Sequence, residues 1–244
     1  MTQLNAASAA LKKSHKPWAN HMKIFEKRKS ASGRRKIYIC GIRVLSYKKK
    51  SNKAAQIEVH GQNNQIKLAN RRNPKLRIYV NGNNNLIDIR TTQYFCADIN
   101  IGFTDSTCSN CKIIIDSDTS SNGISIMLME NDSQLTIGQN CLFSSNIMLW
   151  CSDTHTITDM DGNITNIGHS IEIGNHCWIG MHAKILKNTK IPDDSIVGMG
   201  SIVTKKFETP NSVYAGNPAK LIKSNINWNH MRPQRYIEQQ NKNQ

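Results

Sequence analysis

The sequence predicts an all-β fold, a parallel β-helix built from six-residue repeats. Between Ile137 and Thr204, apolar residues recur at every sixth position, a spacing that neither an α-helix nor an alternating strand produces. Ten of the twelve positions taken at this step are apolar, and the two exceptions, His155 and Asp161, are neighbours in the series. Three short strands and their turns would form one triangular coil of about eighteen residues, and stacked coils bury one another's faces.

Two other positions of the repeat have their own composition. Six of the seven glycines in this stretch come immediately after the apolar position, where a residue without Cβ can take the positive φ of a tight corner. The fifth position, which we expect to point inward near a corner, holds small or medium residues: Cys141, Cys177, Ala183, Thr189, Ser195 and Ser201. Glycine is therefore predicted to turn the chain, and the fifth position to fill the corners of the core.

The repeat divides the chain into three predicted regions. Residues 1–53 form a basic N-terminal arm with a leading strand, residues 54–207 form the β-helix, and residues 208–244 form a C-terminal turn with a tail or short helix. Within the arm, residues 1–30 are predicted to be helical or partly disordered, and residues 36–47 to form a strand that leads into the β-helix.

The early coils are less regular than the later ones. The stretch that begins at Gly61 returns 21 residues later at Gly82, which is the length of one coil with a small bulge. Ile113 and Leu135 continue the same series. About eight coils fit between residues 54 and 207.

Composition limits the compartment and the chemistry. No apolar run approaches the length of a membrane span, and the N-terminus lacks the apolar stretch of an export signal, so we expect a cytoplasmic protein. The number of cysteines, seven, is odd, and we see no export signal. Both observations argue against a disulfide framework. Cys108 and Cys111 have the spacing of a metal or redox pair, but no second pair and no nearby histidine accompany them. No metal site is predicted.

The net charge of +15 is concentrated near the N-terminus. Residues 11–53 contain fifteen Lys or Arg and a single acid, Glu26. Such a cluster suits a polyanion, which can be a nucleic acid, an acidic membrane surface or an anionic glycan. The alternative is a tail that only keeps the protein soluble.

The two positions that break the repeat lie in a polar stretch that follows Asp153, and the coil is predicted to resume at Ile167. A histidine at such an outward break, here His155, is free to meet a ligand, and a nearby carboxylate can orient its ring. On periodicity alone, an ordinary histidine in a surface loop is the favoured interpretation.

Four motifs lie between Ser145 and Lys223, followed by Asn225-Ile-Asn-Trp228. They are Asp153-Thr-His155, Ile171-Glu-Ile-Gly-Asn-His-Cys-Trp-Ile-Gly180, Ile196-Val-Gly-Met-Gly-Ser-Ile-Val-Thr-Lys205 and Tyr214-Ala-Gly-Asn-Pro-Ala-Lys220. Together they resemble the hexapeptide-repeat acyltransferases of the left-handed β-helix class, closest to bacterial capsular-polysaccharide and sialic-acid O-acetyltransferases. The resemblance covers residues 36–228 loosely and 135–228 well. It implies the left hand of the β-helix.

The resemblance also implies direct transfer of an acetyl group from acetyl-CoA, as co-substrate, to a sugar hydroxyl, without a metal or a covalent intermediate. His155 matches the general base, which takes the hydroxyl proton and returns a proton to the leaving thiolate. A backbone N–H would stabilise the oxyanion. Asp153 is the candidate that orients His155, and Trp178 matches a tryptophan at the acetyl or pantetheine end of the site. The family's site lies between subunits of a homotrimer, so His155 and Trp178 are expected from different chains.

The cofactor is expected along the C-terminal coils. The positions carried over for it are Trp178, Gly180, Met181, Met199, Thr204, Lys205, Lys206 and Lys220. Backbone groups near Met181 and Met199 would hold the pantetheine arm, and the lysines would lie near the adenosine phosphates. The alternative for these lysines is ordinary solvated side chains. His176 and His182 are expected to be structural.

The sequence therefore predicts an O-acetyltransferase for a bacterial capsular or other surface polysaccharide. The acceptor is expected to be anionic, with contact to the inner membrane through the basic arm and no nucleic-acid partner. Two alternatives stay open. One is an acetyltransferase for a small acceptor, such as a nucleotide sugar or a drug, and the other is a non-catalytic β-helix that binds polyanions.

Overall fold

The structure is a computed structural model that describes residues 25–29, 34–39, 42–48 and 54–242. The chain separates into two compact units, Met1–Ser51 and Asn52–Gln244. Within the described ranges, no helix has the length and apolar character needed to cross a membrane. The predictions for residues 1–24 lie outside the described residues.

The first unit contains a three-stranded antiparallel sheet. Its strands are β1 (Phe25–Lys29), β2 (Arg34–Ile39) and β3 (Ile42–Lys48), paired in that order. The expectation of a helical or partly disordered segment up to residue 30 is therefore wrong at residues 25–29, which form a strand. The strand character predicted over residues 36–47 is confirmed in the described residues, but it is divided between β2 and β3. Only two residues separate β2 from β3, a length that favours a local hairpin over one long strand.

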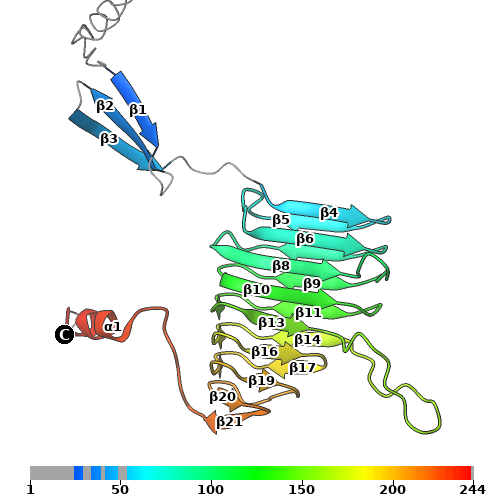
Figure 1. Ribbon diagram of the computed structural model, residues 1–244. Coiled ribbons are helices and arrows are strands. Elements are labelled where there is room, and N and C mark those ends of the chain that lie inside the picture. Colours follow the sequence, from blue (N-terminus) through cyan, green and yellow to red (C-terminus); the bar gives the residue numbers. More distant parts are fainter. Residues whose placement is uncertain (1–24, 30–33, 40–41, 49–53, 243–244) are drawn as a thin grey trace, which may run out of the picture. The chain divides into compact units, whose positions relative to one another are not determined.

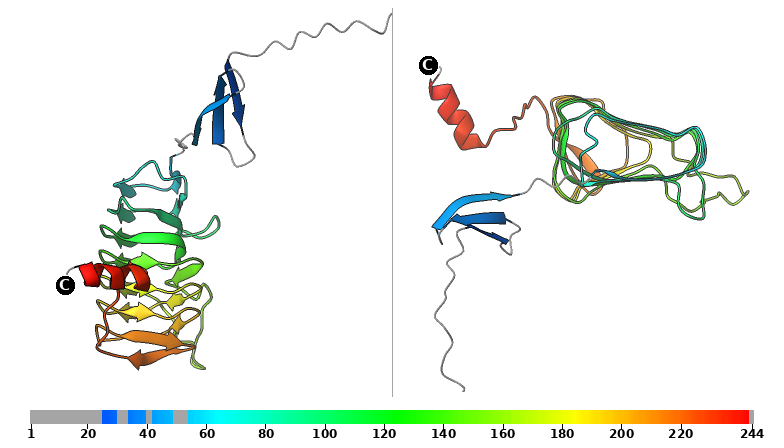
Figure 2. Two further views of the ribbon diagram at one scale, coloured as in Figure 1. Left: turned by 90° about the vertical axis from the view of Figure 1, so that its left-hand side faces the viewer. Right: turned by 90° about the horizontal axis from the view of Figure 1, so that it is seen from above.

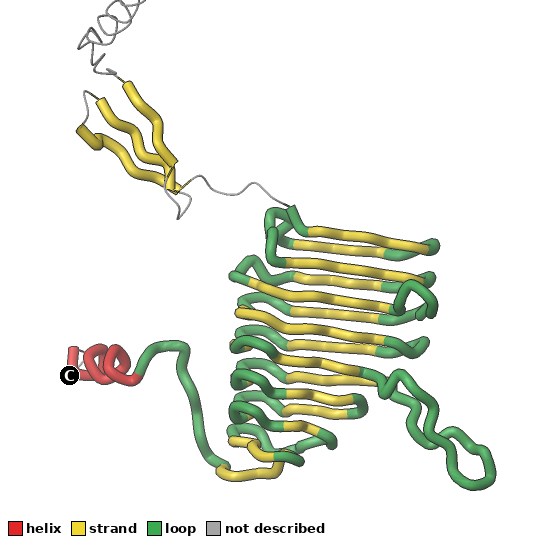
Figure 3. The backbone as a smooth tube through the Cα atoms, viewed as in Figure 1, coloured by secondary structure: helices red, strands yellow, loops and turns green. Residues whose placement is uncertain are grey.

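The second unit is a β-helix whose coils stack into a prism (Figures 1 and 3). One face consists of β4 (Gln56–His60), β6 (Leu76–Asn81), β8 (Phe95–Ile101), β10 (Ser120–Leu128), β13 (Ile147–Trp150), β16 (Lys184–Leu186) and β19 (Ile202–Val203). The second consists of β5 (Gln65–Leu68), β7 (Leu86–Ile89), β9 (Lys112–Ile115), β11 (Gln134–Ile137), β14 (Ser170–Ile173) and β17 (Thr189–Ile191). The third starts on β10 and continues through β12 (Leu142–Phe143), β15 (Trp178–Ile179), β18 (Ile196–Val197) and β20 (Val213–Gly216).

Two elements end the second unit. The strand β21 (Ala219–Lys223) pairs antiparallel with β20, whereas the stacked strands of the three faces pair in parallel. The helix α1 (Pro233–Lys242) follows, which confirms the predicted short C-terminal helix.

The core is a set of aliphatic ladders that run along the prism. On the second face, Ile87, Ile113, Leu135 and Ile171 are partners in successive strands, and each is fully buried. Burying one such side chain contributes about 1.5–3 kcal/mol. Ile66 pairs with Ile87, which confirms the predicted 21-residue repeat of the early coils. Seven strands stack on the first face, against about eight coils expected, because the early coils are longer than eighteen residues and because residues 152–169 add length without adding a coil.

The chain turns at the corners of the prism through different residues from those predicted. Glycines such as Gly138 and Gly174 do not have positive φ; a Cβ on Gly138 would lie 2.7 Å from the carbonyl carbon of Gly174. These glycines therefore allow neighbouring coils to approach closely. The positive φ falls two residues later, on polar residues that tolerate it: Asn140, Asn146, His176, His182, Asn188 and Asp194. The fifth positions are buried as predicted.

An extruded loop, residues 152–169, leaves the prism between β13 and β14 (Figure 3). Leu149 pairs with Ile185, 36 residues later, whereas Ile185 pairs with Val203, only 18 residues later. The loop therefore adds the length of one coil without adding a coil, and the six-residue register stays in phase across it. Ile167 is 51% exposed, so the coil resumes at β14 and not at Ile167.

Candidate active site

The two ends of the extruded loop are tied together by one carboxylate. Glu130 follows β10 and is half-buried. Its Oε1 accepts a hydrogen bond of 2.7 Å from the Ser152 hydroxyl, and its Oε2 accepts one from the backbone N–H of Gly168. Because hydrogen bonds to a charged acceptor are the stronger ones, this pair fixes where the loop leaves and re-enters the prism.

A second set of hydrogen bonds joins the two ends of the loop close to His155. The ammonium of Lys187, which follows β16, donates hydrogen bonds to Asp153 Oδ2 and to the carbonyl of Asn166. The Asn166 amide donates to Asp153 Oδ2 at 3.0 Å and to the His155 carbonyl at 2.8 Å. We call Glu130, Ser152, Asp153, Asn166 and Lys187 the loop clasp. Within it, Asn166 holds the backbone of His155 through the His155 carbonyl.

The clasp determines the charge of Asp153. Hydrogen bonds from Lys187 and then from Asn166 hold the pKa of the Asp153 carboxyl below its ordinary value of 3.8. Asp153 is therefore an anion over the whole neutral range. Both partners bind Oδ2 of Asp153.

The His155 ring itself is exposed. Among the described residues, neither of its ring nitrogens takes part in a hydrogen bond, and none joins it to Asp153. Within one chain, therefore, no hydrogen bond supports the expectation that Asp153 orients the His155 ring. The arrangement leaves an imidazole with a fixed backbone and open ring nitrogens, which suits a group that must meet a substrate.

The far end of the loop forms a short hairpin. Thr158 and Ile164 pair as an antiparallel bridge. Asp159 Oδ1 accepts hydrogen bonds from the backbone N–H groups of Asp161 and Asn163, at 3.0 and 2.9 Å. These bonds order the loop tip although none of its large apolar side chains is buried: Ile157, Met160 and Ile164.

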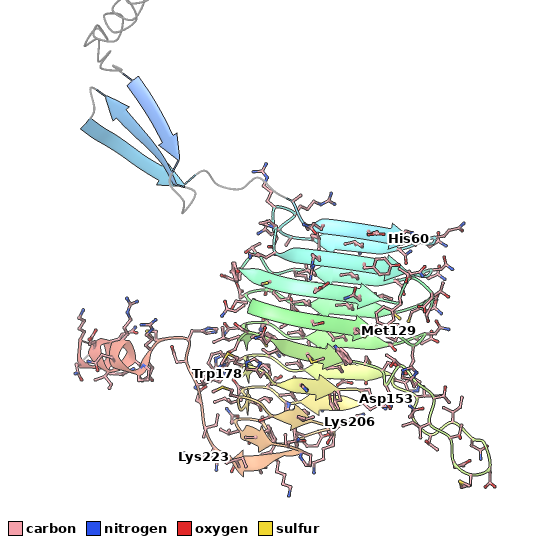
Figure 4. The ribbon with its side chains drawn as sticks, viewed as in Figure 1. His60, Met129, Asp153, Trp178, Lys206 and Lys223 are labelled. Carbon is pink, nitrogen blue, oxygen red and sulfur yellow. The ribbon has the colours of Figure 1, made fainter. Side chains whose placement is uncertain are left out.

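Trp178 lies on the opposite side of the prism from Asp153 (Figure 4). It is 38% exposed on β15, and its ring centroid lies 6.0 Å from that of Trp228. The Trp228 ring stacks on His176 at 4.4 Å and donates its Nε1–H to the His176 carbonyl at 2.7 Å. His176 in turn bonds to Asp194 at 2.9 Å. His176 therefore has the structural role expected of it.

An apolar groove opens beside Trp178, with a volume of about 590 Å³. We call it the Trp178 groove. Its wall on the prism comprises Trp178, Ile196 and Trp228, and its wall on α1 and the preceding segment comprises Met231, Pro233, Tyr236 and Ile237. Residues from four elements or segments therefore meet there.

The residues carried over for the cofactor do not gather in one place. Met181 and Met199 are neighbours in successive coils, since the Gly200 N–H bonds to the Met181 carbonyl at 2.9 Å. Both are exposed, and a Cβ on Gly180 would lie 2.6 Å from the Met199 nitrogen. Thr204 is also exposed. Met181 and Met199 lie in the turns after β15 and β18, whereas Thr204 follows β19 and so lies at the next corner of the prism.

The predicted lysines divide between two places. Lys206 lies on the Asp153 side (Figure 4), and its backbone pairs with that of Lys190 as an isolated parallel β-bridge. Lys205 Nζ lies 5.9 Å from the Phe207 ring centroid. Lys220 lies on β21, opposite Ala215.

A larger hollow of about 700 Å³ lies across the first face, next to the turn that contains His182. Asn146 and Met148 line it, and three cationic side chains stand at its edge: Lys75, Arg77 and Lys184. Arg77 is paired with Asp98. The hollow has a larger volume and more charged lining residues than the Trp178 groove.

Cys108 and Cys111 point into the core, with their sulfur atoms 3.2 Å apart. The hydrogen bond between the two thiols raises the pKa of Cys108 well above its ordinary value, and burial adds to the effect. Within the ranges that the structure describes, no three His, Cys, Asp or Glu side chains gather as metal ligands.

Several site residues had no signal in the sequence. Glu130 lies 38 residues from Gly168, whose backbone N–H donates to it. Lys187 and Asn166 belong to no motif. Each becomes visible only when the coils are stacked.

Comparisons with known proteins agree with this fold. The family model described as bacterial transferase hexapeptide (six repeats) matches residues 170–205. A polysialic acid O-acetyltransferase of Neisseria meningitidis is 33% identical over 180 residues, which is 72% of this chain and 80% of the relative. A galactoside O-acetyltransferase of Escherichia coli is 38% identical over 93 residues, 38% of this chain and 45% of the relative.

Two solved structures share the architecture. The polysialic acid O-acetyltransferase OatWY has a TM-score of 0.51 at 26% identity, with 72% of this chain and 92% of that chain covered. The polySia specific acetyltransferase NeuO has a TM-score of 0.54 at 23% identity, with coverage of 78% and 99%, and so shows the fold alone. The left-handed β-helix predicted from the sequence is confirmed. This chain belongs to the family of hexapeptide-repeat O-acetyltransferases.

Proposed function

We propose that this protein transfers an acetyl group from acetyl-CoA to a hydroxyl of an anionic bacterial surface polysaccharide, with polysialic acid as the first candidate. The observation that carries the proposal is His155, whose backbone is held by Asn166 in the loop clasp while its ring stays exposed. A relative that aligns with 72% of this chain is named for the same acceptor.

In the proposed reaction, His155 removes the proton of the sugar hydroxyl as the oxygen attacks the thioester carbonyl. A new carbon–oxygen bond forms, and the tetrahedral oxyanion accepts hydrogen bonds from backbone N–H groups. The intermediate then breaks its carbon–sulfur bond, and the imidazolium returns the proton to the leaving thiolate of CoA. The sugar ester and the free thiol are the products.

We infer that the working enzyme is a homotrimer. Asp153, two residues before His155, and Trp178 lie on opposite sides of one prism, so a single chain does not bring the loop to the Trp178 groove (Figure 4). A closed ring of copies would place the loop of one chain against the groove of the next. Mixing His155→Ala and Trp178→Ala chains, followed by reassembly, should restore part of the activity that each lacks. No recovery above the unmixed variants would contradict a shared site.

The anionic acceptor is supported by charge in both units. The first unit, residues 1–51, contains fourteen Lys or Arg and one Glu. The hollow on the first face of the β-helix adds Lys75 and Lys184 at its edge. Cationic surfaces concentrate a polyanion near the site and raise its association rate.

The deciding experiment is His155→Ala, with His169→Ala as the matched control from the same loop. Activity is measured as free thiol released from acetyl-CoA with polysialic acid as acceptor, and NMR locates the acetyl group. General-base assistance is worth about 10²–10⁴-fold, so His155→Ala should lose that factor while acetyl-CoA still raises the melting temperature. A variant that keeps more than about a tenth of the turnover, or a wild type without thiol release, would overturn the proposal.

A small acceptor is the second candidate, because the galactoside O-acetyltransferase is also a relative. The same assay with polysialic acid, free sialic acid and a simple galactoside separates the two. A higher kcat/KM for the galactoside would favour the small acceptor. Release of thiol with none of the three, together with salt-sensitive polyanion binding, would favour the non-catalytic binder.

A further inference from the structure

Cys108 and Cys111, whose spacing suits a redox pair, have no part in the proposed reaction. Both side chains are buried, with 0% and 1% exposed, and their sulfur atoms lie 3.2 Å apart. The sulfur atoms of a disulfide lie about 2.05 Å apart, so the two thiols are about 1 Å from the geometry of a bond. We call them the thiol pair. An isolated buried cysteine is inert, whereas two thiols in contact can be oxidised together.

A single amide holds the backbone of the thiol pair in place. The buried Asn85 donates its Nδ2 to the Cys108 carbonyl at 3.0 Å, and its Oδ1 accepts the Cys111 N–H at 2.8 Å. Between the two cysteines, Asn110 turns the chain with a φ of 60°. The two sulfur atoms are therefore kept together by the fold. Groups that are held in contact react with each other much faster than the same groups free in solution.

The thiol pair is connected to the loop clasp through Glu130. The Cys111 thiol donates to the Glu130 carbonyl at 3.3 Å, and the Glu130 carboxylate accepts from Ser152 and Gly168. Since one thiol carries one hydrogen, Cys108 is then the donor within the thiol pair. This hydrogen bond lowers the pKa of Cys111, which makes its sulfur the better nucleophile. A chain of hydrogen bonds thus joins the thiol pair to the extruded loop, which Figure 2 shows leaving the prism.

An exposed turn provides the route to the buried sulfur atoms. Residues 103–107, which come directly before Cys108, are all exposed, and the turn is closed by a bridge between Phe103 and Ser106. Opening an exposed turn costs less free energy than unfolding the coils. A small uncharged oxidant such as hydrogen peroxide can enter through such an opening, whereas a bulky disulfide reagent is excluded.

We propose that the thiol pair is a redox-modification site for a peroxide, and that its disulfide loosens the loop clasp. The Cys111 sulfur attacks one peroxide oxygen, the oxygen–oxygen bond breaks, and the first water leaves a sulfenic acid on Cys111. The Cys108 sulfur attacks the Cys111 sulfur, the sulfur–sulfur bond forms, and the sulfenic oxygen leaves as the second water. The two thiols lose two electrons and two protons, and the peroxide takes up both.

The disulfide changes the surroundings of Glu130 in two ways. Cys111 no longer carries a hydrogen for the Glu130 carbonyl, and its sulfur moves towards Cys108. The Glu130 carboxylate then holds Ser152 and Gly168 less firmly, so the root of the His155 loop is less well placed. For its effect on turnover the inference rests on the proposed function of this loop, whereas formation of the disulfide does not.

Peptide mapping tests the modification in the full chain. After treatment with dilute hydrogen peroxide, the tryptic peptide of residues 91–112 should be lighter by two hydrogens, with the loss between Cys108 and Cys111, and dithiothreitol should restore its mass. Cys108→Ala should abolish the loss. Cys141→Ala, which removes a buried thiol of another coil, is the matched control that should keep it. A wild-type peptide that stays unchanged, or that only gains oxygen, would overturn the proposal.

Turnover tests the link to the loop clasp, with the peroxide removed before thiol release is measured. Oxidation should lower kcat by about two- to tenfold, the effect of losing one hydrogen bond, with the KM for acetyl-CoA unchanged and recovery on reduction. Cys108→Ala should keep its turnover after peroxide. In Glu130→Ala, where the clasp is already broken, oxidation should cause no further loss.

An oxidised wild type with full turnover, or an equal loss in Glu130→Ala, would overturn the link between the thiol pair and the clasp. Failure of the proposed function looks different, because a reduced wild type would then release no thiol from acetyl-CoA. The peptide map still decides whether the thiol pair is a modification site in that case.

Discussion

Lys187 reaches back from the coil that follows the extruded loop and forms an ion pair with Asp153, two residues before His155. The Lys187 side chain is only 17% exposed and donates to the Asn166 carbonyl as well. Asp153 therefore acts on the position of the loop root through Lys187 and Asn166.

This pairing predicts that Asp153→Asn and Lys187→Met have the same kinetic effect. Either change releases the loop root, so kcat should fall in both while the KM for acetyl-CoA stays near the wild-type value. The conservative change Lys187→Arg, which keeps the donors, should restore part of kcat. If Asp153 instead oriented the imidazole, Asp153→Asn would lower kcat far more than Lys187→Met. Steady-state kinetics of the four proteins decide between the two roles.

The same ion pair predicts a pH dependence of stability. Because the folded pKa of Asp153 lies below its ordinary value of 3.8, the ion pair stabilises the fold above about pH 4. That stabilisation is lost as the pH falls through the lower, folded-state pKa. With the carboxylate 40% exposed, solvent screening limits the effect to less than about 1 kcal/mol. Urea unfolding from pH 3 to 6 should show a steeper acid loss for wild type than for Asp153→Asn; parallel profiles would contradict the assignment.

Glu130 is predicted to be a positioning residue for the reaction. Glu130→Ala removes the two oxygens that accept from Ser152 and Gly168, at a cost of about 1.5–3 kcal/mol for each charged hydrogen bond. Glu130→Gln keeps one oxygen and should retain more activity than the alanine variant. A purely structural role would lower the melting temperature without this graded change in kcat. Glu172→Ala, on the exposed side of β14, is the control expected to leave both unchanged.

Gly138 is predicted to be required for close packing of coils and not for its φ. A Cβ there would lie 2.6 Å from Asn175 Oδ1 and 2.7 Å from the Gly174 carbonyl carbon. Gly138→Ala should therefore destabilise the fold by about 1–3 kcal/mol, and Gly138→Asn by at least as much. Ser144→Ala, at the same position of the next repeat, is the control. Better tolerance of Asn than of Ala would point back to a positive φ.

The basic first unit is predicted to act on the acceptor alone. Deleting Met1–Ser51 removes a net charge of +13 and follows the boundary between the two compact units. The KM for polysialic acid should rise, and the salt sensitivity of the reaction should fall, because screening shortens the Debye length from about 10 Å at 0.1 M to about 3 Å at 1 M. Acetyl-CoA binding should not change. Identical acceptor kinetics and salt response in the two proteins would leave the unit as a solubilising tail.

The β-helix could be predicted from the sequence because its signal is local. Within each coil, a residue such as Ile179 or Ile185 must point inward whatever the other coils do, and this requirement repeats every six residues. The repeat survived the extruded loop only because that loop is as long as a coil, which also made Ile167 look like a core residue. The role of glycine was misjudged for the opposite reason: the space beside Gly138 is set by the next coil.

His155 and Trp178 could be proposed from motifs, but the groups that hold them could not. Glu130 and Gly168 meet across 38 residues, and nothing in their immediate sequence differs from that of ordinary surface residues. Trp228 and His176 lie in motifs, but their contact across 52 residues shows only in the structure. By itself the sequence determined which side chains face the core, since inward and outward positions alternate within a single coil. Only the tertiary structure decided which polar side chains close the loop and which apolar ones stay uncovered, because those contacts depend on the stacking of distant coils.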